Sequence, residues 1–278
     1  DDVITVSEAD IARWMQFAFE RLKLVIEPSA AVGVAAIRSP AFRERARAAG
    51  WRHAALVNAR VTRNPTVAAN AVPAGTGILI RVEKSGADKN AAGAPCGEVE
   101  PGWGVGKIKR CGADAVKLLA QFEPTEFDSA ERNFEFTRQM YEDCIKHDIL
   151  FLLEPIHFPF NGEKDGAKSQ VERKATTVIE SAKFLSRYCD IYKSEFPGTF
   201  GHESDAQLMD NLKRLNDACA KPWVLLSAGV DYDKYRKQVE MAMKAGASGI
   251  LGGRAFWKEF FTFANPADRQ KFAETECV

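Results

Sequence analysis

The stretch Asp190-Ile191-Tyr192-Lys193-Ser194-Glu195-Phe196-Pro197 predicts one strand followed by a loop, because it lies between a helical stretch and a Pro-Gly break. An amphipathic helical stretch, 171–188, precedes it. Since side chains alternate along a strand, Lys193 should share a face with Ile191 and Glu195. An ammonium group is costly to bury, so a lysine in this strand needs a structural or chemical reason.

The same helix and strand pattern repeats from about residue 76 onward. The predicted strands are 77–84, 113–119, 149–155, 190–195, 223–227 and 249–253. The predicted helices between them include 131–147, 205–220 and 231–245. Strands that alternate with helices pair in parallel through right-handed crossovers. The sequence therefore predicts the α/β class.

Polar residues recur at the carboxyl ends of these predicted strands. They are Lys84, Lys117, Glu154, Lys193, Ser227 and Arg254. A doubly wound open sheet would gather such residues at one switch point, whereas a (β/α)8 barrel builds its active site from many strand ends. The spread favours a TIM-type barrel. Its other two strands would have to come from the first 75 residues, so we expect it to be incomplete or irregular over its first two units.

The last two strand ends combine glycines with residues that bind anions. Leu226-Ser227-Ala228-Gly229 ends one strand and Gly252-Gly253-Arg254 the next. Glycines let backbone N–H groups approach an anion, and an arginine can pair with it. The corresponding loops of such barrels often bind phosphate. Ser227, Gly229, Gly253 and Arg254 are thus the predicted phosphate site, with ordinary turns as the alternative.

Lys193 has two interpretations at this stage. Burial lowers the pKa of a lysine, and a partly deprotonated lysine is a nucleophile that can form a Schiff base with a carbonyl. Alternatively, Lys193 caps the strand end beside Glu195 as a structural ion pair.

Composition limits the classes of partner. The 278 residues, 46% of them hydrophobic, suit one large domain, and 38 basic against 38 acidic residues give a net charge of zero. We therefore expect neither nucleic acid nor a membrane as partner. No apolar segment approaches the length of about 20 residues that crosses a bilayer, and no signal peptide is expected. The six cysteines lack metal spacing and suggest a reducing cytoplasm, and the four histidines lack the spacing of metal ligands.

Six motifs, in order, carry a family resemblance. They are Glu83-Lys84-Ser85-Gly86, Gly112 to Leu119, Leu153-Glu154-Pro155, the Lys193 run, Leu226-Ser227-Ala228-Gly229 and Gly252-Gly253-Arg254. Over residues 73–265 the chain resembles the tagatose-1,6-bisphosphate aldolase family, which includes the sulfofructose-phosphate aldolases. The resemblance implies a class I aldolase on a (β/α)8 barrel, without metal or cofactor, that cleaves a phosphorylated ketose to dihydroxyacetone phosphate and an aldehyde. It also implies that Lys193 is the Schiff-base lysine.

Such chemistry needs further charged groups near Lys193. Glu154 is the candidate for acid–base work, because its apolar neighbours should raise its pKa, although a neighbouring lysine could instead tie it up. Lys117 either supplies positive charge to the site or pairs with Asp114 or Glu154. Lys84 and His157 are weaker candidates for substrate binding. A solvated strand-end charge and a loop histidine without a role are their alternatives.

The first quarter of the chain does not follow the aldolase pattern. Residues 3–48 resemble a C-terminal part of the catalytic domain in serine racemases and threonine dehydratases, but lack the lysine and glycine-rich loop that hold pyridoxal phosphate there. The aldolase family's first-strand Asp-Gln-Arg motif is also missing, whereas 53–57 could form the second strand. We therefore divide the chain into an atypical segment, 1–72, and a barrel core, 73–278.

Two other functions stay open on the sequence alone. One is a phosphosugar isomerase or epimerase on the same barrel, with Glu154 as the base and no imine. The other is a catalytically defective remnant or a binding protein. A small phosphosugar is the expected partner in either case, and the sequence leaves a homo-oligomer open.

Overall fold

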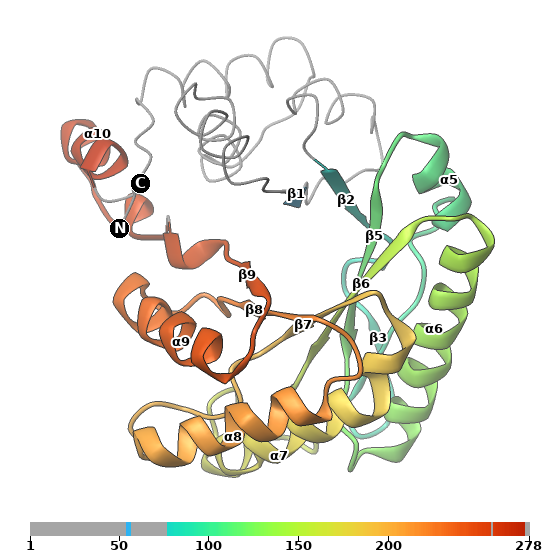
Figure 1. Ribbon diagram of the computed structural model, residues 1–278, viewed down its shortest axis with the longest axis horizontal. Helices are drawn as coiled ribbons and strands as arrows, with labels where there is room; N and C mark the ends of the chain where they lie inside the picture. The colour runs from blue at the N-terminus through green and yellow to red at the C-terminus, as the bar shows by residue number, and fades with distance from the viewer. Residues whose placement is uncertain (1–53, 57–76, 257, 276–278) are drawn as a thin grey trace.

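The computed structural model describes residues 54–56, 77–256 and 258–275. Seven parallel strands form one curled sheet in the order β1-β2-β5-β6-β7-β8-β9 (Figure 1). The strands are β1 (Ala54–Leu56), β2 (Gly77–Arg81), β5 (Ala115–Gln121), β6 (Leu150–Ile156), β7 (Ile191–Ser194), β8 (Trp223–Leu226) and β9 (Gly249–Leu251). The α/β barrel predicted from the sequence is confirmed as a curled parallel sheet with helices, and the described part of it is an incomplete barrel.

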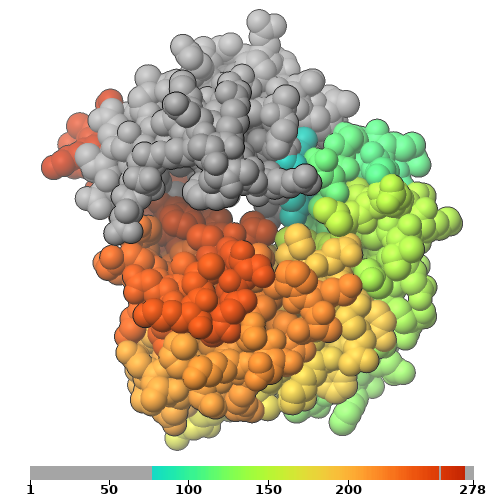
Figure 2. All heavy atoms as spheres, in the orientation of Figure 1, coloured from blue at the N-terminus to red at the C-terminus, as the bar shows by residue number. Residues whose placement is uncertain are grey.

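Helices lie on the outer side of the curled sheet. They are α5 (Val105–Arg110), α6 (Phe127–Lys146), α7 (Lys168–Leu185), α8 (Asp205–Ala218) and α9 (Tyr232–Ala245), with α10 (Pro266–Thr275) following the last strand. Figure 2 shows the surface that they form, from α6 in green through α7 and α8 in yellow and orange. Short 3₁₀ helices cover Ser186–Tyr188, Arg254–Phe256 and Lys258–Phe261, and β3 (Asp88–Lys89) and β4 (Pro95–Cys96) form a small hairpin. Within the described ranges, no helix is both long and apolar enough to span a bilayer.

The predicted elements are present, but several of their ends differ. Strand β2 ends at Arg81 rather than at 84, because beyond this residue the chain leaves β5 and forms an antiparallel bridge between Glu83 and Val99. Strand β1 confirms the expected strand within 53–57, since Ala54–Leu56 pairs in parallel with β2. The resemblance over 3–48 and the family's first strand fall outside the described residues.

Two apolar clusters lie on opposite faces of the sheet. The larger cluster joins Tyr192 and Leu118 to helix residues such as Leu185 and Leu208. The smaller cluster contains Leu79, Ala115 and Leu152, with Ile191 and Leu251 packed against it. The alternation expected around Lys193 is confirmed, because Tyr192 belongs to the cluster on the side of the described helices and Ile191 packs against the cluster on the other face.

Helix α9 ends at a glycine that the local geometry requires. Gly246 has φ 111°, and a Cβ there would clash with Oδ1 of Asn216, which accepts a hydrogen bond from Trp223 Nε1 at 3.1 Å. We expect Gly246→Ala to lower the free energy of unfolding by about 2 kcal/mol or more, from the left-handed backbone and the displaced amide together.

Gly112 is the matched control for this substitution. Its φ is 83°, but nothing lies within 4 Å of an added Cβ. Gly112→Ala should therefore cost only the backbone part, about 1 kcal/mol. If both variants lost the same melting temperature, the expected cost of displacing Asn216 in Gly246→Ala would be contradicted.

Candidate active site

Four charged side chains meet on the face of the sheet opposite the described helices α5 to α9. Lys193 Nζ lies 2.7 Å from Glu154 Oε1, and Lys117 Nζ lies 2.8 Å from Glu154 Oε2. Lys117 also contacts Glu83, with 3.1 Å between Nζ and Oε1. Acidic and basic groups therefore alternate in one row of contacts, which we call the charge network: Glu83, Lys117, Glu154 and Lys193.

The spacing of residues along the strands places the charge network next to the smaller apolar cluster, on the same face of the sheet. Lys117, Glu154 and Lys193 each follow by two positions a residue of that cluster, namely Ala115, Leu152 and Ile191. Because side chains two apart share a face, all three point into the interior, one layer nearer the carboxyl ends of the strands. Active sites of (β/α)8 barrels lie at this end.

The network is buried, and its charges act strongly on one another. Lys117, Glu154 and Lys193 are only 5%, 8% and 6% exposed, so water screens their interactions weakly. Burial raises the pKa of Glu154, but the charges and hydrogen bonds of Lys117 and Lys193 outweigh it, so that this pKa lies below its ordinary value. The expectation that the pKa of Glu154 is raised was wrong, because the sequence did not reveal two lysines on one carboxylate.

The pKa of Lys193 lies below its ordinary value. Burial is the largest cause and the charge of Lys117 adds to it, while Glu154 opposes both. Lys193 thus becomes a neutral amine at a lower pH than a solvated lysine, with an ionised carboxylate beside it to accept a proton. This combination suits a nucleophilic lysine.

Replacing Lys117 by methionine should shift the titration of Lys193 toward higher pH. The variant loses a positive charge that lowers the pKa of Lys193 and of Glu154, so both groups should stay protonated to higher pH. The pH dependence of acetylation of Lys193 by acetic anhydride, followed by peptide mass spectrometry, measures this shift. Lys84→Met is the control and should leave the profile unchanged, whereas an unchanged profile in Lys117→Met would contradict the coupling.

The predicted phosphate-binding residues also come together, at the ends of β8 and β9. Gly253 N–H donates to Ser227 Oγ at 3.3 Å, which joins the two strand ends. A Cβ on Gly229 would lie 3.0 Å from Cζ of Arg254, so the guanidinium group packs directly on this glycine. Arg254 itself is exposed and keeps its donors accessible.

The backbone between Ser227 and Val230 forms a tight left-handed turn. Ala228 has φ 49° and Gly229 has φ 72°, and Val230 N–H donates to Ser227 O at 3.1 Å. A non-glycine residue with positive φ is strained, and such strain often marks a binding or catalytic site. Lys258 holds this turn from outside, since its Nζ donates to Gly229 O at 2.9 Å and pairs with Asp231.

Lys84 and His157 lie beside the charge network rather than in it. Lys84 pairs with Glu98, outside the buried interior. His157 binds the buried Glu195 twice, through its backbone N–H at 2.7 Å and through Nδ1 at 2.8 Å, both to Oε2. Burial raises the pKa of Glu195, but the hydrogen bond and the charges of His157 and Lys174 outweigh it and hold this pKa below its ordinary value. Substrate contacts of Lys84 and His157 stay predictions.

Glu83 is the residue that the sequence analysis missed. Its neighbour Lys84 was chosen as a strand-end charge, yet Glu83 is the one that reaches Lys117. The available signal was alternation, because Glu83 follows Leu79 by four positions and so shares its inward face. Glu83 is only 8% exposed, and carboxylates are rarely buried to this extent unless they are paired, as Glu83 is with Lys117.

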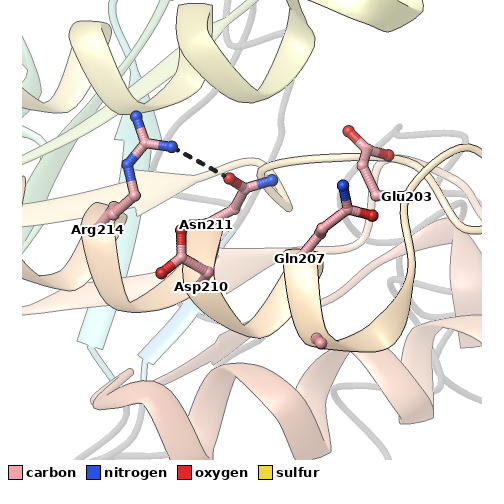
Figure 3. Close-up of a pocket in the computed structure, with 6 residues that line it drawn as sticks. Glu203, Gln207, Asp210, Asn211 and Arg214 are labelled. Carbon is pink, nitrogen blue, oxygen red and sulfur yellow. Dashed lines mark hydrogen bonds between the residues drawn. The ribbon is translucent and has the colours of Figure 1, made fainter.

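A shallow cavity of about 450 Å³ lies along α8, on the outer surface (Figure 3). Its lining comes from α8 and the residues just before it: Glu203, Ala206, Gln207, Asp210, Asn211 and Arg214. These side chains fan out along one helix, and Arg214 donates only a long hydrogen bond of 3.5 Å to Asn211. None belongs to the charge network. Buried, coupled ionisable groups are a stronger mark of a reactive site than an open hollow, so we place the site at the strand ends.

Two curated proteins show what the chain is similar to. The chain is 31% identical over 201 residues to tagatose 1,6-diphosphate aldolase 1 of Enterococcus faecalis, covering 66% of this chain and 61% of that protein. It is 30% identical to tagatose 1,6-diphosphate aldolase of Listeria monocytogenes, covering 66% of this chain and 59% of the relative. The chain thus spans about three fifths of the length of these relatives.

Solved aldolase structures share the fold. A structure of an archaeal fructose-1,6-bisphosphate aldolase, with its catalytic lysine bound to the carbinolamine intermediate, matches with a TM-score of 0.54 at 17% identity, covering 86% of this chain and 82% of that chain. A Schiff base forming fructose-1,6-bisphosphate aldolase matches with a TM-score of 0.51 at 18% identity, covering 73% and 71%. The family model described as DeoC/LacD family aldolase matches residues 45–259, which is most of the chain. The chain therefore belongs to the DeoC/LacD aldolase family.

Proposed function

We propose that this protein is a class I aldolase that reversibly cleaves a phosphorylated ketose to dihydroxyacetone phosphate and an aldehyde. The observation that carries the proposal is the buried contact of 2.7 Å between Lys193 and Glu154, in a chain of the aldolase family. A ketose resembling tagatose 1,6-bisphosphate or a sulfofructose phosphate is the proposed substrate, in keeping with the curated relatives.

Lys193 would act first, as the nucleophile. Its neutral amine adds to the C2 carbonyl of the ketose to form a carbinolamine, and loss of water leaves a protonated imine. Glu154 lies where it can take the proton of the Lys193 ammonium group, which makes the amine neutral, and return it to the hydroxyl group that leaves as water, so that it is ionised again for the next step. The positive imine then serves as the electron sink for the next step.

Glu154 would then take the proton of the C4 hydroxyl. The C3–C4 bond breaks, its electron pair moves to the imine to give an enamine, and the aldehyde leaves with a new carbonyl at C4. Protonation of the enamine at C3 and hydrolysis of the imine release dihydroxyacetone phosphate and restore Lys193. Lys117 would stabilise the ionised form of Glu154 between these steps.

The ends of β8 and β9 would hold the phosphate of the ketone-side fragment. Arg254 offers guanidinium donors, Gly229 and Gly253 allow close approach of the backbone, and Ser227 offers a hydroxyl group. These strands follow β7 in the sheet, so the phosphate would lie on one side of Lys193.

Borohydride trapping tests the proposal. The full chain is incubated with dihydroxyacetone phosphate and sodium borohydride, which reduces the imine to a stable secondary amine, and intact mass is followed by peptide mapping. We expect one adduct, on Lys193. A folded protein without an adduct would overturn the imine mechanism and favour the isomerase alternative, in which Glu154 acts without a covalent bond.

Other parts of the interpretation stay predictions. They are the division into 1–72 and 73–278, the resemblance of 3–48 to a part of serine racemases and threonine dehydratases, and a homo-oligomeric state. The position of the chain in the cytoplasm is likewise a prediction from its cysteines.

A further inference from the structure

Glu83 carries a buried carboxylate oxygen without a partner. Its Oε1 contacts Lys117, whereas Oε2 is fully buried and is the one buried side-chain nitrogen or oxygen among the described residues that lacks a hydrogen-bond partner. A buried acceptor without a donor costs stability, and such atoms in native proteins usually have a reason. The other three members of the charge network use their polar groups on one another.

The order of the strands shows which part of a substrate would reach this oxygen. Lys193 on β7 has the proposed phosphate site on one side, at β8 and β9, and Glu154, Lys117 and Glu83 on the other, toward β6, β5 and β2. The C2 atom of the bound ketone carries two carbon substituents that point apart. With the phosphate-bearing C1 directed toward Arg254, C3 and its hydroxyl group point toward Lys117 and Glu83.

We propose that Glu83 is a substrate-binding residue whose Oε2 accepts a hydrogen bond from the C3 hydroxyl of the ketose. The assignment rests on the proposed aldolase function and names a specificity determinant within it. Because Oε1 is held by Lys117, Oε2 keeps a fixed position, and the bound substrate would reach it by displacing the atoms that bury it. A site built around a hydroxyl group discriminates against an analogue that lacks it, since the buried acceptor then stays unpaired.

Two ketones test the assignment directly. Dihydroxyacetone phosphate carries the C3 hydroxyl, and hydroxyacetone phosphate has a hydrogen in its place. The measured quantity is the ketone concentration that gives half-maximal borohydride-trapped adduct on the full chain. For the natural chain we expect this concentration to be about 10- to 100-fold lower for dihydroxyacetone phosphate, as befits a hydrogen bond to a charged acceptor.

Glu83→Gln separates a substrate contact from a structural role. The amide keeps the size and can still accept from Lys117, but it lacks the second carboxylate oxygen. We expect the preference between the two ketones to fall by about tenfold or more, while the melting temperature stays near that of the natural chain. If Glu83 only positioned Lys117, both ketones would weaken together and the ratio would persist, which would overturn the assignment.

Glu98→Gln is the matched control, because Glu98 pairs with Lys84 outside the network. It should keep the natural ratio. Equal concentrations for both ketones in the natural chain would also overturn the assignment, with no need for a variant that folds. Adducts with neither ketone would refute the proposed aldolase function and, with it, this role of Glu83, so that the two failures are distinguishable.

Discussion

Lys193→Met should lose all borohydride-trapped adduct, and its rate of ketose cleavage should fall by on the order of 10⁴- to 10⁶-fold, the range found when a catalytic nucleophile or its partner is removed. Methionine fills a similar volume in the buried position but has no amine. Glu154 keeps its second partner, Lys117, at 2.8 Å, so the variant does not leave a buried carboxylate alone. Intact mass and a coupled assay for the released triose phosphate measure the two losses.

Lys84→Met is the control for this experiment. Lys84 stands near the end of a neighbouring strand but pairs with Glu98, outside the charge network. It should keep both the adduct and most of the cleavage rate. An adduct of normal yield in Lys193→Met would show that another lysine forms the imine and would refute the assignment.

Glu154→Gln should separate imine formation from bond cleavage. The glutamine keeps the size of the side chain and can still accept from one of the two lysines through its amide oxygen, but it cannot take the proton of the C4 hydroxyl. We expect the cleavage rate to fall by roughly 10²- to 10⁴-fold, the usual contribution of an acid–base group. The trapped adduct should still form, but more slowly, because Lys193 retains its amine in the same buried position and loses the carboxylate that takes its proton.

Comparing trapping with cleavage in Glu154→Gln gives the decisive ratio. Loss of cleavage with the adduct retained assigns the proton transfer to Glu154. A cleavage rate within a few-fold of that of the natural chain would show that another group takes the proton. Loss of both signals together, on a folded protein, would instead show that Glu154 is needed to form the imine.

The sequence predicted the fold class because its signals are local. The alternation of apolar strands with amphipathic helices appears within windows of about 15 residues. A capping residue or a glycine at the end of a helix then marks where one strand-helix unit ends. Gly246, for example, stands just after the last residue of α9. Strand ends were less certain, as β2 shows, because Arg81 ends the strand only where the next residues turn toward Val99.

The sequence predicted which residues form the candidate site better than it predicted the contacts between them. Lys193, Glu154 and Lys117 stand out as charges in apolar strands, and each lies in the network. Which groups touch depends on the register between strands, and a single sequence does not state that register. The low pKa of Glu154 and the role of Glu83 both follow from contacts across strands, so neither was expected.

Unequal pairing between the strands gives the site a stiff half and a more compliant half. Strands β5 and β6 are in register over seven residue pairs, from Ala115 with Leu150 to Gln121 with Ile156, whereas β6 and β7 share only two such pairs. The backbones that carry Lys117 and Glu154 are therefore held in a fixed position relative to each other. Lys193 stands on the looser neighbour, so the small displacement that carries its nitrogen from the carboxylate to a carbonyl carbon can occur in β7 while the acid–base pair stays still.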